Sequence, residues 1–287
     1  MTFRLLSIGH GYCAQAFSRT LVHDGWEVVG TTRSKDKMQR APDASRMVLF
    51  PGDDIAHELS HATHLLVSAG PGDEGDPFLH QYADDIAAAT HLDWIGYFST
   101  TGVYGDRRGG WVTEEDEVAP STLRGRRRKE VEAAWQAVAQ DHGLPLHIFR
   151  LAGIYGPGRG PFSKVRSGTA RRIIKKGQVF SRIHVDDIAQ VLRASIARPN
   201  PGAVYNVCDD DPAPPQDVLE YAAELLGLPT PPAEDFDTAD MSPMARSFYA
   251  ESKRVCNKRI KDELGVDLLY PDYRVGLKAL VTQDQPA

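Results

Sequence analysis

Residues 4–14 read RLLSIGHGYCA, a segment that joins a strand pattern to a helix pattern. The apolar run at 4–8 predicts a short buried strand, and an amphipathic helix follows it. The turn between them reads GxGxxA: Gly9 can make the tight turn, Gly11 has no Cβ to block a pyrophosphate, and Ala14 lets helix and strand pack closely. Free N–H groups at the start of the helix favour phosphate binding. We therefore predict a dinucleotide site whose turn contributes Gly9, Gly11, Tyr12 and Cys13.

The composition fits a soluble globular protein. The chain has 287 residues, 41% hydrophobic and 25% charged, which is enough to build a large core. The net charge of −6 argues against nucleic acid or an anionic membrane surface as a partner. No apolar run is long enough to span a bilayer, and no secretion signal precedes the first strand. Three distant cysteines without a CxxC pair predict a cytoplasmic protein with no metal site.

Strand patterns and helix patterns alternate through the first half of the chain. Strands are predicted at 4–8, 26–32, 47–50, 64–69, 94–99 and 146–150. Helical patterns lie between them, and the longest covers 124–141. This alternation predicts βαβ units with right-handed crossovers, and therefore an α/β fold with a Rossmann-type, doubly wound parallel sheet. In such sheets ligands bind at the carboxyl ends of the strands.

The second half of the chain is less regular. It carries a Gly/Pro-rich loop at 156–161, then a helix pattern at 185–197, a strand pattern at 203–207, a helix near 216–226, and two or three terminal helices. We predict a dinucleotide-binding domain at 1–160, to which 178–208 returns. The remaining residues, 161–177 and 209–287, are predicted to form a smaller C-terminal substrate region.

The end of the second predicted strand bears on the choice between NAD and NADP. In NAD-binding folds an acidic residue at this point binds the ribose hydroxyls. Here residues 30–35 read GTTRSK and contain no acid. Arg33 and Ser34, with Lys35 beside them, could instead bind a 2′-phosphate, because guanidinium and hydroxyl groups match its oxygens. We predict NADP in preference to NAD; the alternative interpretation is a solvated basic loop.

Four further segments resemble one family, in the same order along the chain. They are FSTTGVYG at 98–105, RLAGIYGPG at 150–158, RIHVDDIA at 182–189 and GAVYNVCD at 202–209. Together they resemble the extended short-chain dehydrogenases, the NAD-dependent epimerase/dehydratase family, over nearly the whole chain. The resemblance implies NAD(P) in the N-terminal domain and hydride transfer between the nicotinamide and a small molecule, such as a nucleotide sugar or another carbonyl or alcohol.

The resemblance also implies roles for particular residues. After the fourth strand the family has small residues that let the cofactor ribose approach, and here these are Ser68, Ala69 and Gly70. Thr100 stands where the family has a Ser or Thr that bonds the substrate oxygen; alternatively it only caps the end of its strand. The family often forms homodimers through the helices after the fourth and fifth strands, although the basic start of the second helix opposes a symmetric pairing here.

The catalytic YxxxK of the family is missing from its expected place. Residues 124–132 read RGRRRKEVE, so Arg124 stands at the Tyr and Arg128 at the Lys. Arginine is effectively always protonated and cannot exchange a proton near neutral pH, whereas general acid catalysis contributes about 10²–10⁴ in rate. Arg128 could keep the ribose contact and the positive field. The proton would then come from water, from Tyr104 or from the substrate itself.

A literal YxxxK occurs at 249–253 as YAESK. We interpret it as a coincidence, because it lies in the substrate region and is expected to be far from the helix after the fifth strand.

Two functions remain open. The first is an NADP-dependent oxidoreductase or epimerase with a small, anionic or sugar-type substrate, in which Thr100 orients the substrate oxygen and Arg124 and Arg128 supply positive charge. The second is a protein that keeps the nucleotide fold without the chemistry and acts as a regulator or scaffold. The missing Tyr favours the second function. The retained Thr100 and the intact cleft segments favour the first, which we prefer.

Overall fold

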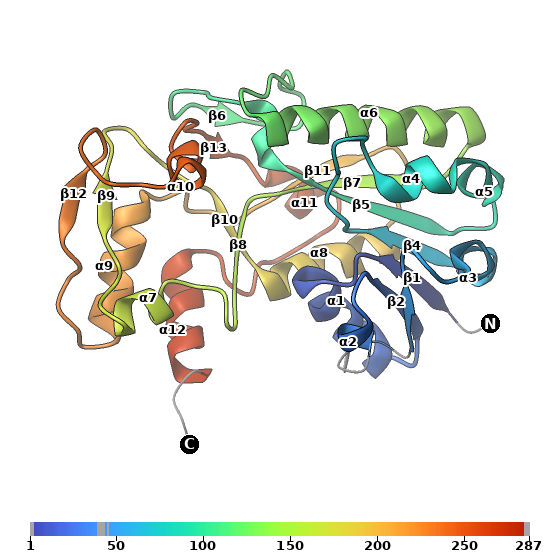
Figure 1. Cartoon of the computed structure of the whole chain (residues 1–287), viewed down its shortest axis with the longest axis horizontal. Coiled ribbons are helices and arrows are strands. Elements are labelled where there is room, and N and C mark those ends of the chain that lie inside the picture. Colours follow the sequence, from blue (N-terminus) through green and yellow to red (C-terminus); the bar gives the residue numbers. More distant parts are fainter. Residues whose placement is uncertain (1–2, 39–43, 45, 284–287) are drawn as a thin grey trace.

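Seven parallel strands form the central sheet, in the order β3-β2-β1-β4-β5-β7-β11. The computed structural model describes residues 3–38, 44 and 46–283. The predicted Rossmann-type α/β class is confirmed, and Figure 1 shows the sheet with helices on both sides. The strands are β1 (Arg4–Ile8), β2 (Glu27–Thr32), β3 (Arg46–Leu49), β4 (His64–Val67), β5 (Trp94–Thr100), β7 (Leu146–Leu151) and β11 (Val204–Val207).

Helices cover both faces of this sheet because side chains alternate along each strand. On β1, Leu5 packs in a core with α1 and α8, whereas Leu6 packs in a second core with α3, α5 and α6. In Figure 1, α6 runs along one side of the sheet and α8 along the other. The helices around the sheet are α1 (Tyr12–His23), α2 (Lys35–Met38), α3 (Ile55–His61), α4 (Pro77–Gln81), α5 (Ala83–Ala88), α6 (Leu123–His142) and α8 (Val185–Ala197).

A smaller region lies beyond the carboxyl ends of the strands, and its elements come from several parts of the chain (Figure 1). It contains three two-stranded parallel pairs, β8–β10, β9–β12 and β6–β13. A separate hydrophobic core joins α7, α9 and α12. Its elements are β6 (Trp111–Val112), β8 (Gly153–Tyr155), α7 (Phe162–Arg166), β9 (Arg172–Ile174), β10 (Arg182–His184), α9 (Pro215–Leu225), β12 (Ala233–Asp235), α10 (Pro243–Phe248), β13 (Arg254–Val255) and α12 (Tyr273–Gln283). In contrast, α11 (Lys258–Asp262) packs on the central sheet, because Ile260 belongs to the same core as α1 and α8.

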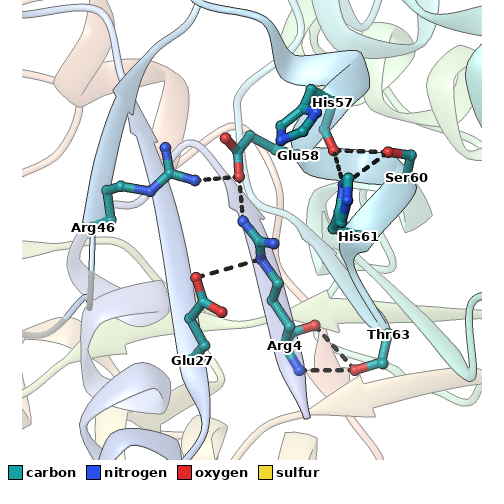
Figure 2. A network of polar contacts seen from close by, with 8 residues as sticks. All are labelled: Arg4, Glu27, Arg46, His57, Glu58, Ser60, His61 and Thr63. Carbon is teal, nitrogen blue, oxygen red and sulfur yellow. Dashed lines mark hydrogen bonds and ion pairs between the residues drawn. The ribbon is translucent and has the colours of Figure 1, made fainter. Parts of the chain in front are cut away.

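A charged network ties the amino ends of the first three strands together (Figure 2). Glu58 on α3 is 5% exposed and accepts hydrogen bonds from Arg4 on β1 and Arg46 on β3, each at 2.5 Å. Glu27 on β2 lies 3.6 Å from Arg4, and Thr63 accepts the backbone N–H of Arg4 at 2.9 Å. Because the strands are parallel, this network lies at the edge of the sheet opposite to the glycine turn.

Two kinds of feature are absent from the described residues. No helix there is both long enough and apolar enough to cross a membrane. The same residues contain no group of three or more His, Cys, Asp or Glu side chains positioned to hold a metal ion.

Candidate dinucleotide-binding and active site

The glycine turn after β1 is held between the end of β2 and the segment after β4. Gly9 has a φ of +78°, and a Cβ added there would lie 2.7 Å from the backbone nitrogen of Ala69, so only glycine fits. Its N–H donates to the Thr31 hydroxyl at 2.8 Å, and the His10 N–H donates to the Thr31 carbonyl at 3.0 Å. The end of β2 and the segment after β4 therefore fix the shape of this turn.

The start of α1 faces open space. Gly11, the N-cap residue, is exposed, and a Cβ added to it would meet only the Gly9 carbonyl oxygen, at 3.7 Å. No side chain caps this end of α1, and its first turn contains no acidic residue. Backbone N–H groups at an uncapped helix start attract anions, so this turn fits a pyrophosphate.

Cys13 contributes packing rather than a reactive thiol. Its side chain is 8% exposed and belongs to the core between α1 and the sheet. Burial raises the pKa of the thiol to about 11, which keeps it protonated near neutral pH. Any contact of Cys13 with a phosphate would therefore use its backbone N–H.

The predicted 2′-phosphate residues lie directly after β2. Arg33 is exposed, and Ser34 is half-buried with its N–H donating to the Thr32 hydroxyl at 3.2 Å. β2 ends at Thr32, two residues before Ser34, and Thr31 holds the glycine turn. Arg33 and Ser34 are therefore at the carboxyl edge of the sheet, on the same side as the glycine turn.

The segment after β4 is bound to the glycine turn. β4 ends at Val67 rather than at residue 69, because Ser68 and Ala69 leave the ladder while both donate N–H bonds to the Ile8 carbonyl, at 2.9 and 3.1 Å. The Ser68 hydroxyl also donates to the Gly9 carbonyl at 2.5 Å. This brings two of the predicted cofactor neighbours against the turn.

Arg128 reaches from α6 to the carboxyl ends of β4 and β5. It donates to the Tyr97 hydroxyl at 2.9 Å and to the Phe98 carbonyl at 2.6 Å. A Cβ added to Gly70 would lie 3.9 Å from its guanidinium. Tyr97 is fully buried, and burial raises its pKa to about 12 despite the Arg128 charge. A fixed positive charge therefore lies beside Gly70, where the resemblance implies the cofactor ribose.

Thr100 ends β5 and caps the short 3-10 helix that follows, η1 (Thr101–Tyr104). Its hydroxyl oxygen accepts the Gly102 N–H at 3.1 Å, as in the alternative interpretation of this residue. Accepting that bond leaves the hydroxyl proton free to donate. The two interpretations are compatible, because Thr100 is only half-buried and one hydroxyl can both cap η1 and bond a substrate oxygen.

The start of α6 packs tightly on η1. Thr122 caps the helix by accepting the Gly125 N–H at 3.1 Å. A Cβ added to Gly125 would lie 2.8 Å from the Gly102 carbonyl oxygen and 2.7 Å from the Pro120 side chain. This contact brings α6, with Arg128, next to the end of β5. Arg124 is exposed in the first turn of α6, with its guanidinium 5.6 Å from the centre of the Phe248 ring.

The expectation that residues 249–253 lie far from α6 is wrong. Ser121, just before α6, donates to Glu251 at 2.5 Å, and Arg124 stacks over Phe248. The chain after α10 therefore folds over the start of α6, an approach that no local pattern marks.

The YxxxK at 249–253 still does not form a catalytic pair. Tyr249 follows α10 and packs against Phe180 and Phe236, with ring centres 5.7 and 5.4 Å apart. Lys253 pairs with Glu251 at 2.7 Å just before β13. Tyr249 and Lys253 do not share a helix, so they are not aligned one turn apart as the motif requires.

Tyr104 belongs to a buried network. It is fully buried, donates to the Asn206 side chain at 2.7 Å and accepts from Arg150 at 2.9 Å. Arg150 in turn pairs with Glu132 of α6 at 2.8 Å. Burial raises the pKa of Tyr104 to about 12. These contacts give Tyr104 a structural role and argue against it as the proton donor.

The fold and the site define a class. A parallel sheet in this order, a glycine turn bound between β2 and β4, and an uncapped helix start at the carboxyl edge are the features of a Rossmann-type dinucleotide-binding protein. Residues 85–208 match the NAD dependent epimerase/dehydratase family. Over this segment the chain is similar to that family.

Known proteins with similar chains include one curated protein and two solved structures. Protein YeeZ of Escherichia coli K12 is 29% identical over 92% of this chain and 95% of its own. A functionally unknown conserved protein from Silicibacter pomeroyi DSS is 57% identical, with a TM-score of 0.93 over 99% of this chain and 100% of its own. UDP-glucuronic acid 4-epimerase from Bacillus cereus, solved with NAD, has a TM-score of 0.77 at 16% identity over 98% and 99% of the two chains, a likeness of fold alone.

Proposed function

We propose that this protein is an NADP-dependent oxidoreductase or epimerase that acts on a small, anionic or sugar-type substrate. The observation that carries the proposal is the arrangement around the glycine turn. Gly11 opens onto free space at an uncapped helix start, Ser68 holds the turn, and Arg128 is fixed beside Gly70. When bound, the nicotinamide would exchange a hydride with a substrate carbon.

The preference for NADP rests on the residues after β2. The segment 30–35 contains no acid to bind the ribose hydroxyls, and Arg33 is exposed with Ser34 beside it. An exposed guanidinium with an adjacent hydroxyl suits a phosphate dianion. The guanidinium has no acceptor, so it cannot replace the carboxylate that accepts the ribose hydroxyl protons.

The remaining residues suggest how a substrate would be held. The Thr100 hydroxyl has a proton to donate to a substrate oxygen at the end of β5. Arg124 presents positive charge in the first turn of α6, which favours an anionic substrate. Since Arg124 cannot transfer a proton and Tyr104 is buried in hydrogen bonds, the proton would come from water or from the substrate.

The permanent charge of Arg124 and the buried hydrogen bonds of Tyr104 also favour a second candidate function. A protein that binds NADP without a general acid at the family position would act as a regulator or scaffold that reports cofactor binding. The two candidates share the cofactor site and differ in turnover.

The test is isothermal titration calorimetry with NADP⁺ and NAD⁺ on the wild type and on Arg33→Asp. We expect the wild type to prefer NADP⁺, and Arg33→Asp to weaken NADP⁺ by about 10–100-fold, because hydrogen bonds to charged groups contribute about 1.5–3 kcal/mol. NAD⁺ binding should not weaken, because the new carboxylate can accept the ribose hydroxyl protons. Lys37→Ala, which removes an exposed charge from α2, is the matched control.

Two outcomes would count against the proposal. No binding of either dinucleotide to the wild type would reject the cofactor site. Equal affinity for both, unchanged in Arg33→Asp, would reject the NADP preference. If NADP⁺ binds, NADPH consumption with a panel of carbonyl compounds detects an oxidoreductase. Epimerised product from a sugar-type substrate, without net NADPH consumption, detects an epimerase, and the absence of both activities indicates a silent binder.

A further inference from the structure

The Gly/Pro-rich loop between β8 and α7, residues 156–161, lies against the start of α1. The Tyr12 hydroxyl donates to the Pro157 carbonyl at 3.0 Å. A Cβ added to Gly156 would lie 2.5 Å from the same hydroxyl and 2.7 Å from Val185, so the loop is seated closely. The loop that leaves β8 therefore approaches the glycine turn from the other half of the chain.

Arg159 is the charged residue of this loop, and it lies beside the helix start. Its guanidinium is 5.7 Å from the centre of the Tyr12 ring. The Arg159 charge also opposes the effect of burial on the pKa of both Tyr12 and Cys13, which places that charge near the first residues of α1. The side chain is exposed, and within the described part of the chain no carboxylate forms an ion pair with it.

Positive charge therefore collects at this point from two sources. The uncapped start of α1 carries the positive end of the helix dipole and has no acid in its first turn. Arg159 adds a full charge from outside the helix. Two other charges also act on the pKa of Tyr12: Asp186 on α8 raises it and Arg19 on α1 lowers it. Because these two effects oppose each other, the effect of Arg159 remains.

We propose that Arg159 binds the pyrophosphate of the dinucleotide on the side away from the glycine turn, so that loop 156–161 covers it. The inference rests on the proposed function, because it requires a dinucleotide on the turn. A guanidinium forms paired hydrogen bonds with phosphate oxygens. Tyr12 holds Arg159 near this position before the ligand arrives, and the flanking glycines, Gly158 and Gly160, let the side chain adjust.

The pyrophosphate is common to NAD and NADP, so Arg159 should affect both equally. This separates its role from that of Arg33, which is proposed to act on the 2′-phosphate alone. It also predicts that a ligand without a pyrophosphate is insensitive to Arg159.

The experiment is isothermal titration calorimetry on the full chain with NADP⁺, NAD⁺, ADP-ribose and 2′-AMP. We expect Arg159→Ala to weaken the three pyrophosphate ligands by about 5–20-fold, in line with a charge-assisted hydrogen bond at an exposed site. Binding of 2′-AMP should stay the same. Lys164→Ala, which removes an exposed positive charge from α7 directly after the loop, is the matched control. It should leave the affinities for all four ligands unchanged.

The outcomes separate the two proposals. If the wild type binds no dinucleotide, the proposed cofactor site fails and this inference fails with it. If the wild type binds and Arg159→Ala binds equally well, only the role of Arg159 is overturned. An equal loss in Lys164→Ala, or a loss that includes 2′-AMP, would also overturn it, because the effect would then be one of general charge or of structure.

Discussion

Arg128 connects the helix α6 with the carboxyl end of β5. Its two bonds, to the Tyr97 hydroxyl and the Phe98 carbonyl, fix the guanidinium beside Gly70. Both bonds come from one nitrogen, Nη1, whereas Nη2 is the atom that lies toward Gly70. Arg128 therefore supplies charge and also holds the end of β5.

Replacing Arg128 should weaken binding of the nicotinamide half of the cofactor and leave binding of the adenosine half unchanged. We expect Arg128→Gln to weaken NADP⁺ by about 5–10-fold, since a charged hydrogen-bond donor is lost, and to leave 2′,5′-ADP unchanged because that fragment has no nicotinamide ribose. Calorimetry with both ligands measures this. Arg126→Ala, on the same helix turn but exposed, serves as the control. An equal loss for both ligands would show that the substitution had disturbed the glycine turn instead.

Asp209 is a buried carboxyl at the end of β11. It is 1% exposed, and neither oxygen has a hydrogen-bond partner among the described residues. Burial raises its pKa to about 8, although the charge of Arg182 acts in the opposite direction. An unfolded aspartate ionises near about 3.9. Because the folded pKa is the higher one, this group makes the folded state less stable as pH rises from about 4 to 8.

Asp209→Asn should remove that pH dependence. We expect the melting temperature of the wild type to fall between pH 5 and pH 8 by about 3–6 °C more than that of the variant. Thermal unfolding at both pH values measures the difference. Asp210→Asn, its exposed neighbour, should behave like the wild type. Parallel pH profiles for the wild type and Asp209→Asn would contradict the assignment.

At the level of elements, the carboxyl ends and the amino ends of the parallel strands have different roles. We call these two sides of the sheet the carboxyl edge and the amino edge. The carboxyl edge carries the glycine turn, Ser68 and Thr100, which have exposed or half-buried positions. The amino edge carries the network of Glu58 with Arg4 and Arg46, which joins α3 to β1 and β3 (Figure 2). Loss of the amino-edge network should therefore affect folding and leave ligand binding alone.

Glu58→Gln tests this division. We expect the free energy of unfolding to fall by about 2 kcal/mol, less than for a fully buried pair because the Arg46 side chain is 48% exposed. Urea denaturation measures the loss, and the affinity for NADP⁺ should not change. Glu27→Gln, whose side chain is more exposed and lies 3.6 Å from Arg4, should cost much less. A comparable loss in both variants would argue against Glu58 as the centre of the network.

Long helices were predictable from the sequence, and the shortest strands were not. The helix predicted at 124–141 is α6 (Leu123–His142), and the predicted helix at 185–197 is α8 with the same bounds. The strands β6 and β13 have two residues each, too few to show a period, and they pair across about half of the chain. Only tertiary packing defines such strands.

At the level of the whole molecule, the same limit applies to the site. The glycine turn was predictable because its parts are adjacent in sequence and each glycine has a local steric reason. The approach of Glu251 to Ser121, and of Arg159 to Tyr12, joins residues that are more than a hundred positions apart. No local propensity encodes such contacts, since they follow from how the smaller region packs against the sheet.

The β6–β13 pair has a consequence for how the protein is made. Val112 pairs with Val255, so β6 emerges from the ribosome long before its partner exists. At about 5–20 residues per second, the wait is roughly 7–30 s. During that time the loop after η1 lacks its strand partner, and Ser121 lacks Glu251. The strands that are synthesised first can pair while translation continues. The contact between the start of α6 and Glu251 forms only when synthesis of the chain is almost finished.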